Sequence, residues 1–147
     1  MPRISLKALD VYPFQTRISV RVTDLNYGGH LGNDTLLSLV QEARAAFLNS
    51  FGFSEKNVAG AGLIMSDAVV RYHSEAFAGD ELRFEVAAGE PGRCGFRLFY
   101  RIVRPADMKV IALAETGMVC LDYDTRQMIA LPEGAHILFN NDKGGNG

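Results

Sequence analysis

The sequence of 147 residues contains no tryptophan, only two cysteines and no long hydrophobic run. Cys94 and Cys120 are too few for a disulfide framework and do not have the spacing of a metal motif. We expect both to be buried free thiols in strands, and we expect no metal site. No apolar run reaches the ~20 residues that cross a bilayer, and residues 1–14 lack the apolar core of a secretion signal. These absences predict a cytoplasmic protein without a membrane span.

The chain also lacks an excess of charge of either sign. Its 15 Lys and Arg and 17 Asp and Glu give a net charge of −2 at pH 7, so no basic surface for nucleic acid is expected. The length and the 48% apolar content suffice for one folded core. In the absence of a repeat or a linker, we predict a single domain over residues 1–139 and a disordered tail over residues 140–147.

Alternation of apolar and polar residues predicts strands along most of the chain. The first such segment is residues 14–22. The others are residues 63–73, 82–88, 93–103, 109–121 and 127–131. Residues 109–121 are apolar on both faces, which indicates a central strand. Residues 89–92 (GEPG) favour a hairpin turn.

A single helical pattern interrupts the strands. Leu36, Val40, Ala43 and Phe47 recur at helical spacing, and Asn33 is expected to cap the start of the helix. Because further apolar residues leave only a narrow polar strip, we expect the helix to be mostly surrounded by protein. One strand, one long helix and then several strands predict an α+β fold, with an antiparallel sheet wrapped around the helix. A homodimer or homotetramer would cover an open edge or face of that sheet.

The segment that leads into the helix has the composition of a binding site. Asp24 and Asn26 precede a glycine-rich corner that contains Gly28, Gly29 and His30. Glycines allow a ligand to approach the backbone closely, and the first N–H groups of a helix point toward such a ligand. We therefore expect the site at this corner.

Four segments, in order and spacing, resemble the hotdog-fold acyl-CoA thioesterases of the 4-hydroxybenzoyl-CoA thioesterase type, including those associated with the Tol–Pal system. They are DLNYGGH (24–30), QEAR (41–44), VRYH followed by GDEL (70–82), and RIV (101–103) leading to a last apolar strand and LP (131–132). The resemblance covers roughly residues 14–132. It implies a hotdog fold, dimers or tetramers, and hydrolysis of an acyl-CoA or acyl-carrier thioester. It implies no cofactor other than the coenzyme A that is part of the substrate.

The sequence departs from this family at one important position. Many members carry a catalytic Asp three residues before the second glycine, where this chain has Asn26. An amide cannot take a proton from water, but it can hold a water or donate to an oxyanion. We therefore hypothesise that His30 is the general base and that Asp24 or Asp34 sets its tautomer and charge. Asp24, Asp34 and Glu42 are the alternative bases.

The remaining residues of the expected site contact the substrate. Backbone N–H groups around Gly29–Leu31 are expected to polarise the thioester carbonyl. The predicted substrate-binding residues are Gly28, Gly29, Leu31 and Glu42.

Two other functions are consistent with the same residues. Asp24-x-Asn26 followed by His30 is similar to the D-x-N-P-x-H motif of (R)-specific enoyl-CoA hydratases, although the proline is missing and the histidine lies one residue later. A non-catalytic module that binds acyl thioesters would explain the missing carboxylate at Asn26. The first alternative predicts water addition without thiol release, and the second predicts binding without turnover.

Overall fold

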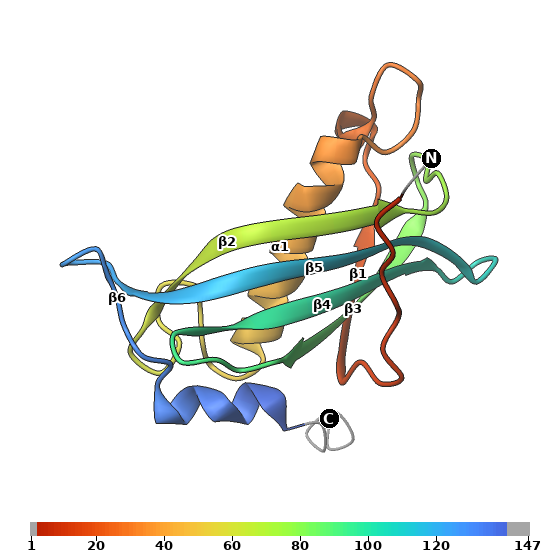
Figure 1. The fold of residues 1–147 in the computed structure, drawn as a ribbon. Helices are drawn as coiled ribbons and strands as arrows, with labels where there is room; N and C mark the ends of the chain where they lie inside the picture. Colours follow the sequence, from red (N-terminus) through yellow and green to blue (C-terminus); the bar gives the residue numbers. More distant parts are fainter. Residues whose placement is uncertain (1–2, 141–147) are drawn as a thin grey trace.

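The computed structural model describes residues 3–140, in which an antiparallel sheet packs against one long helix (Figure 1). In chain order the elements are β1 (Phe14–Ser19), η1 (Val22–Asp24), α1 (Asn33–Asn49), β2 (Gly62–Tyr72), β3 (Glu81–Gly89), β4 (Gly95–Arg104), β5 (Lys109–Asp122), β6 (Gln127–Met128) and η2 (Glu133–Phe139). The labels η1 and η2 denote 3-10 helices. The predicted α+β order of one strand, one helix and then several strands is confirmed.

The sheet has the strand order β1-β3-β4-β5-β2, and the short β6 pairs with β5. All pairings are antiparallel. β5 lies between β4 and β2 and is therefore a central strand, as the apolar pattern of residues 109–121 predicted. The expected hairpin joins β3 to β4, whose register begins with Gly89 opposite Arg97. A bulge interrupts the pairing of β2 with β5 between Met65 and Asp67.

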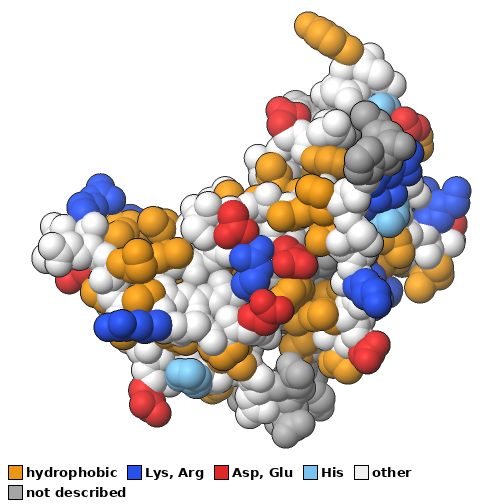
Figure 2. Space-filling view, viewed as in Figure 1, with side chains coloured by type: hydrophobic (Ala, Val, Ile, Leu, Met, Phe, Trp, Pro, Cys, Tyr) orange, Lys and Arg blue, Asp and Glu red, His pale blue; other side chains and the backbone are white. Residues whose placement is uncertain are grey.

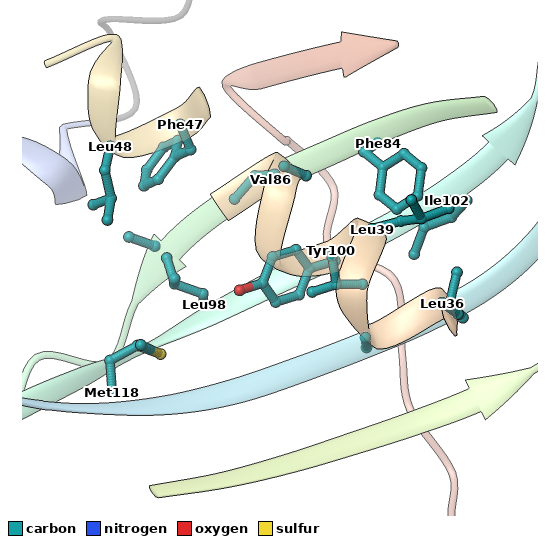
Figure 3. Close-up of a cluster of buried hydrophobic side chains, with 14 of the residues drawn as sticks. Leu36, Leu39, Phe47, Leu48, Phe84, Val86, Leu98, Tyr100, Ile102 and Met118 are labelled. Atoms are coloured by element: carbon teal, nitrogen blue, oxygen red, sulfur yellow. The ribbon is translucent and has the colours of Figure 1, made fainter. Parts of the chain in front are cut away.

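Side chains of α1 fill the core on one face of the sheet (Figure 3). The fully buried Phe47 meets the rings of Phe14 and Phe51 edge-on, at centroid distances of 5.6 and 5.3 Å. Across from α1, the sheet contributes Phe84, Val86, Leu98, Tyr100, Ile102 and Met118. At one end η2 covers the core with Leu138, and Phe139 packs edge-on against Phe96 at 5.5 Å.

The opposite face of the sheet carries ion pairs among hydrophobic side chains. This face is turned toward the viewer in Figure 2, where basic and acidic side chains lie side by side. Arg97 on β4 contacts Asp67 at 2.7 Å and Glu115 at 3.2 Å, and Arg101 pairs with Glu85. The arginines of β4 are therefore balanced by acidic neighbours.

Strand β2 is an open edge of the sheet, and one side of α1 is also uncovered. Ile64 and Met65 on β2 are 41% and 48% exposed, and Leu37 on α1 is 37% exposed. The expectation that the helix would be mostly surrounded by protein is therefore wrong for a single chain. The broad apolar surface of α1 exceeds what one sheet can cover.

Three boundaries differ from the sequence prediction. Asn33 is the first residue of α1, and Gly32 occupies the capping position without a side-chain bond. The first strand ends at Ser19 because the chain turns into η1. The last strand is limited to residues 127–128, and the 3-10 helix at 133–139 was not predicted. Most of the predicted tail, residues 141–147, lies outside the described residues.

Candidate active site

The loop before α1 is held by a buried carboxylate. Asp24 is only 3% exposed, and its carboxylate accepts hydrogen bonds from the Arg21 backbone N–H at 2.8 Å and from the Arg21 guanidinium. Burial by itself would raise the pKa of Asp24, but the hydrogen bonds from Arg21 outweigh it and hold the pKa below its ordinary value. The Asp24 carbonyl also accepts from the N–H of Gly32, at the start of α1. Asp24 therefore fixes the position at which the helix begins.

Asn26 closes the glycine corner with three hydrogen bonds. Its side-chain oxygen accepts a hydrogen bond from the Gly28 N–H at 2.8 Å. Its backbone carbonyl accepts a hydrogen bond from the Gly29 N–H at 3.0 Å. Its own N–H donates to the carbonyl of His30 at 2.9 Å. Gly29 has φ +79°, a conformation that L residues adopt rarely. Within residues 3–140 the Asn26 side-chain NH₂ has no acceptor, so it remains available as a donor.

His30 contacts a carboxylate, but that carboxylate belongs to Glu75. The His30 Nε2 atom lies 3.4 Å from Glu75 Oε2, and Nδ1 lies 3.3 Å from the carbonyl oxygen of Leu31. A carbonyl can only accept, so the Leu31 contact is a hydrogen bond only when the proton is on Nδ1. In that neutral form Nε2 has a lone pair, and its contact with the Glu75 carboxylate becomes an ion pair only when Nε2 gains a proton. The prediction that Asp24 or Asp34 would contact His30 is therefore wrong. Asp24 is bonded to Arg21, and Asp34 lies on α1, where its side chain faces another hollow.

Two hollows flank the start of α1. The first has a volume of about 260 Å³ and is lined by His30, Leu31, Gly32, Asn33, Leu36, residues 72–75 and Ile111. The second, of about 350 Å³, is lined by Leu25, Asn26, Tyr27, Gly32, Asp34 and Thr35. Gly32 borders both, and Asn26 and His30 approach each other across Gly28. A Cβ atom on Gly28 would lie 3.3 Å from Asn26 Oδ1 and 3.2 Å from His30 Nε2.

Of the N–H groups predicted from the sequence, those of Gly29–Leu31, only that of His30 is available at this site. The Leu31 N–H donates a hydrogen bond to the carbonyl of Ala76 at 2.7 Å, and the Gly29 N–H donates one to the carbonyl of Asn26. Along the described chain, the N–H groups of His30 and of residues 33–35 have no protein acceptor. Residues 33–35 form the first turn of α1, where the helix dipole favours negative charge. An oxyanion would therefore meet the first helical turn and not Gly29 or Leu31.

The other predicted residues fall in different places. Leu31 lines the first hollow, whereas Gly28 and Gly29 shape the loop. Glu42 is exposed on α1 and lines neither hollow. Sequence reasoning missed Glu75 and Tyr72, whose hydroxyl donates to the carbonyl of Asn33 at 2.8 Å. The position of these residues at the end of a strand, where polar side chains often form sites, was the available signal.

Neither a metal-binding cluster nor a membrane-spanning helix is found in residues 3–140. No group of three or more His, Cys, Asp or Glu side chains in this range could hold a metal ion. In the same range, no helix has the length and apolarity needed to cross a membrane.

Comparison with known proteins identifies the family of this chain. The model of the thioesterase-like superfamily matches residues 20–137. A 1,4-dihydroxy-2-naphthoyl-CoA hydrolase from Synechococcus elongatus is 30% identical over 126 residues, covering 82% of this chain and 90% of the relative. The crystal structure of a 1,4-dihydroxy-2-naphthoyl-CoA thioesterase from Synechocystis aligns with TM-score 0.75 and 22% identity over 82% of this chain and 90% of that one. A hypothetical protein from Aquifex aeolicus aligns with TM-score 0.78 and 20% identity, over 87% and 100% of the two chains.

The chain belongs to the thioesterase-like superfamily and has its hotdog fold. The family resemblance inferred from the sequence is confirmed, and so is the expectation of an acyl-CoA thioesterase. The relatives lend no support to the hydratase or to the non-catalytic binding module.

Proposed function

We propose that the protein hydrolyses aromatic acyl-CoA thioesters. The observation that carries the proposal is the pair of His30 and Glu75 at the rim of a hollow, beside the unoccupied N–H groups of the first turn of α1. The named substrate of the Synechococcus relative, a dihydroxynaphthoyl thioester, supports an aromatic acyl group.

In the proposed mechanism a water molecule attacks the thioester directly. His30 Nε2 takes a proton from the water as the oxygen attacks the carbonyl carbon, and Glu75 stabilises the positive charge that forms on the imidazole. The N–H groups of residues 33–35 and the Asn26 NH₂ donate to the oxyanion. When the carbon–sulfur bond breaks, the imidazolium returns its proton to the departing thiolate. Asn26 cannot form the acyl anhydride that a carboxylate could form at this position, so no acyl-enzyme is expected.

We propose further that two chains pair through β2. The exposed Ile64 and Met65 lie on this open edge, whose unpaired backbone groups favour a second strand. A two-fold axis at β2 would also cover Leu37 on α1 and would close the side of the hollows that is open in one chain. The free thiols Cys94 and Cys120 are consistent with a reducing compartment, so we place the reaction in the cytoplasm.

The test is release of free thiol from a panel of straight-chain, benzoyl and naphthoyl CoA thioesters. We expect release from the aromatic members and a fall in kcat of at least ~10² in His30→Ala, the scale of general-base catalysis. His136→Ala is the matched control, because His136 is exposed on η2 and remote from the site. Unchanged kcat in His30→Ala would exclude His30 as the base, and no release from any thioester would refute the proposed activity.

A further inference from the structure

A third cavity lies farther along α1 and contains a buried arginine. We call it the Arg44 cavity. It has a volume of about 150 Å³ and is lined by Leu37, Ser38, Val40, Gln41, Arg44, Met65 and Thr116. Arg44 is only 5% exposed and Thr116 is 1% exposed, so both polar groups are held inside the protein. Neither is used by the mechanism proposed above.

A chain of hydrogen bonds fixes these polar groups. Arg44 Nε donates to Glu55 at 3.0 Å, and Arg44 Nη1 donates to the Tyr100 hydroxyl at 3.3 Å. The Tyr100 hydroxyl lies 2.9 Å from Thr116 Oγ1. In residues 3–140, Arg44 Nη2 forms no hydrogen bond. The guanidinium is thus anchored on one side and keeps free N–H groups on another.

The direction of these bonds decides which proton faces the cavity. Because the Tyr100 oxygen accepts from Arg44, its own proton is free to go to Thr116 Oγ1. The reverse direction would leave a donor of Tyr100 without a partner, and Tyr100 is buried and does not line the cavity. Thr116 does line it, and the described chain offers its hydroxyl proton no other acceptor. The favoured arrangement therefore presents the Thr116 O–H to the cavity.

The Arg44 cavity is within reach of the hydrolytic site along a single helix face. Asp34, Ser38 and Gln41 are spaced i, i+4 and i+7, so they lie in a row on α1. Ser38 and Gln41 are about 6 and 10 Å along the axis from Asp34 at 1.5 Å per residue. The exposed Leu37 borders this row. An acyl group with its carbonyl at the first turn can extend one or two rings along this row.

We propose that the Arg44 cavity binds the far end of the acyl group and selects a ring that carries a neutral oxygen there. This proposal rests on the proposed thioesterase function. Thr116 O–H and Arg44 Nη2 would donate to a ring hydroxyl or carbonyl oxygen. A second carboxylate fits less well, because Glu55 already balances the charge of Arg44. The donors would remain unpaired with an unsubstituted ring, and this difference creates the selectivity.

The test compares two CoA thioesters that differ in one group, 2-naphthoyl-CoA and its derivative with a hydroxyl at carbon 4. We expect wild-type kcat/KM to be at least about tenfold higher for the hydroxylated substrate. Thr116→Val should lower this ratio about five- to tenfold, the scale of one hydrogen bond. The loss should occur on the hydroxylated substrate alone. Thr116→Ser keeps the hydroxyl and should keep the ratio. Thr16→Val, the same change on the distant strand β1, should leave both rates unaltered.

The outcomes separate this assignment from the proposed function. Equal wild-type rates for the two substrates, or a ratio unchanged in Thr116→Val, would overturn the assignment and leave the thioesterase in place. No thiol release from either substrate would overturn both. If Thr116→Val fails to fold, equal wild-type rates for the two substrates would still overturn the assignment, and so would a loss of the ratio in Thr116→Ser, which keeps the hydroxyl.

Discussion

Alanine in place of Gly28 would insert a methyl group between the two polar side chains of the loop. The new Cβ would lie 3.2 Å from His30 Nε2 and 3.3 Å from Asn26 Oδ1, closer than ordinary contacts of 3.4–4 Å. Both side chains would have to move by a few tenths of an ångström. Because Gly28 does not have a positive φ, its backbone accepts alanine. We therefore expect a stability loss below about 1 kcal/mol. The displaced catalytic groups should lower kcat about tenfold.

The neighbouring glycine provides the control. A Cβ on Gly29 would meet no atom within 4 Å, but its φ of +79° is strained for alanine. Gly29→Ala should therefore cost about 1–2 kcal/mol of stability. Its effect on kcat should be smaller than that of Gly28→Ala. Thermal unfolding and thiol release measured on both variants test this contrast. Full kcat in Gly28→Ala, or equal losses of kcat in both variants, would refute the reasoning.

Three further predictions follow from contacts described above. Glu75→Gln should lower kcat about tenfold, because the imidazolium of His30 would lose its carboxylate; the effect is modest because the Glu75 side chain is 63% exposed. Unchanged kcat would remove Glu75 from the mechanism. Asp24→Asn should cost about 1 kcal/mol at neutral pH. Since the folded pKa of Asp24 lies below the unfolded value, the contribution of Asp24 is complete above about pH 4 and is lost as the pH falls further. Urea unfolding at pH 7 and pH 3 should show the gap between wild type and variant closing in acid, and a constant gap would contradict the ion pair with Arg21. Phe47→Ala should cost about 3–5 kcal/mol, and a loss below 1 kcal/mol would show that the aromatic cluster around Phe47 contributes little.

Much of the fold could be predicted because its signals are local. The alternation of residues 93–103 and the apolar faces of residues 109–121 depend on neighbours along the chain, and both gave the correct strands. The Gly89–Gly92 turn is likewise encoded by its own residues. The short helix at 133–139 was missed because it packs on the sheet and lacks an amphipathic pattern of helical length.

The details of the site were harder to predict because they depend on contacts between distant segments. His30 meets Glu75 and Leu31 meets the carbonyl of Ala76 only after β2 has folded beside α1. Because the Leu31 N–H donates to the carbonyl of Ala76, it cannot donate to the oxyanion, although the sequence had predicted that it would. The buried position of Asp24 likewise depends on its turn with Arg21. The sequence motif therefore located the loop before α1. The roles of Asp24 and His30 in that loop could be assigned only from the residues that they contact in the folded chain.

The position of η2 has a consequence for the order in which the protein reaches its native state. Phe96 on β4 is covered by Phe139, and Leu138 fills the same end of the core. During synthesis the ribosome makes the sheet and helix before it makes this segment. The core must therefore stay open on one side until residues 133–139 have emerged from the exit tunnel. Until residues 133–139 pack against Phe96, a nascent chain of this protein would present apolar surface there to chaperones.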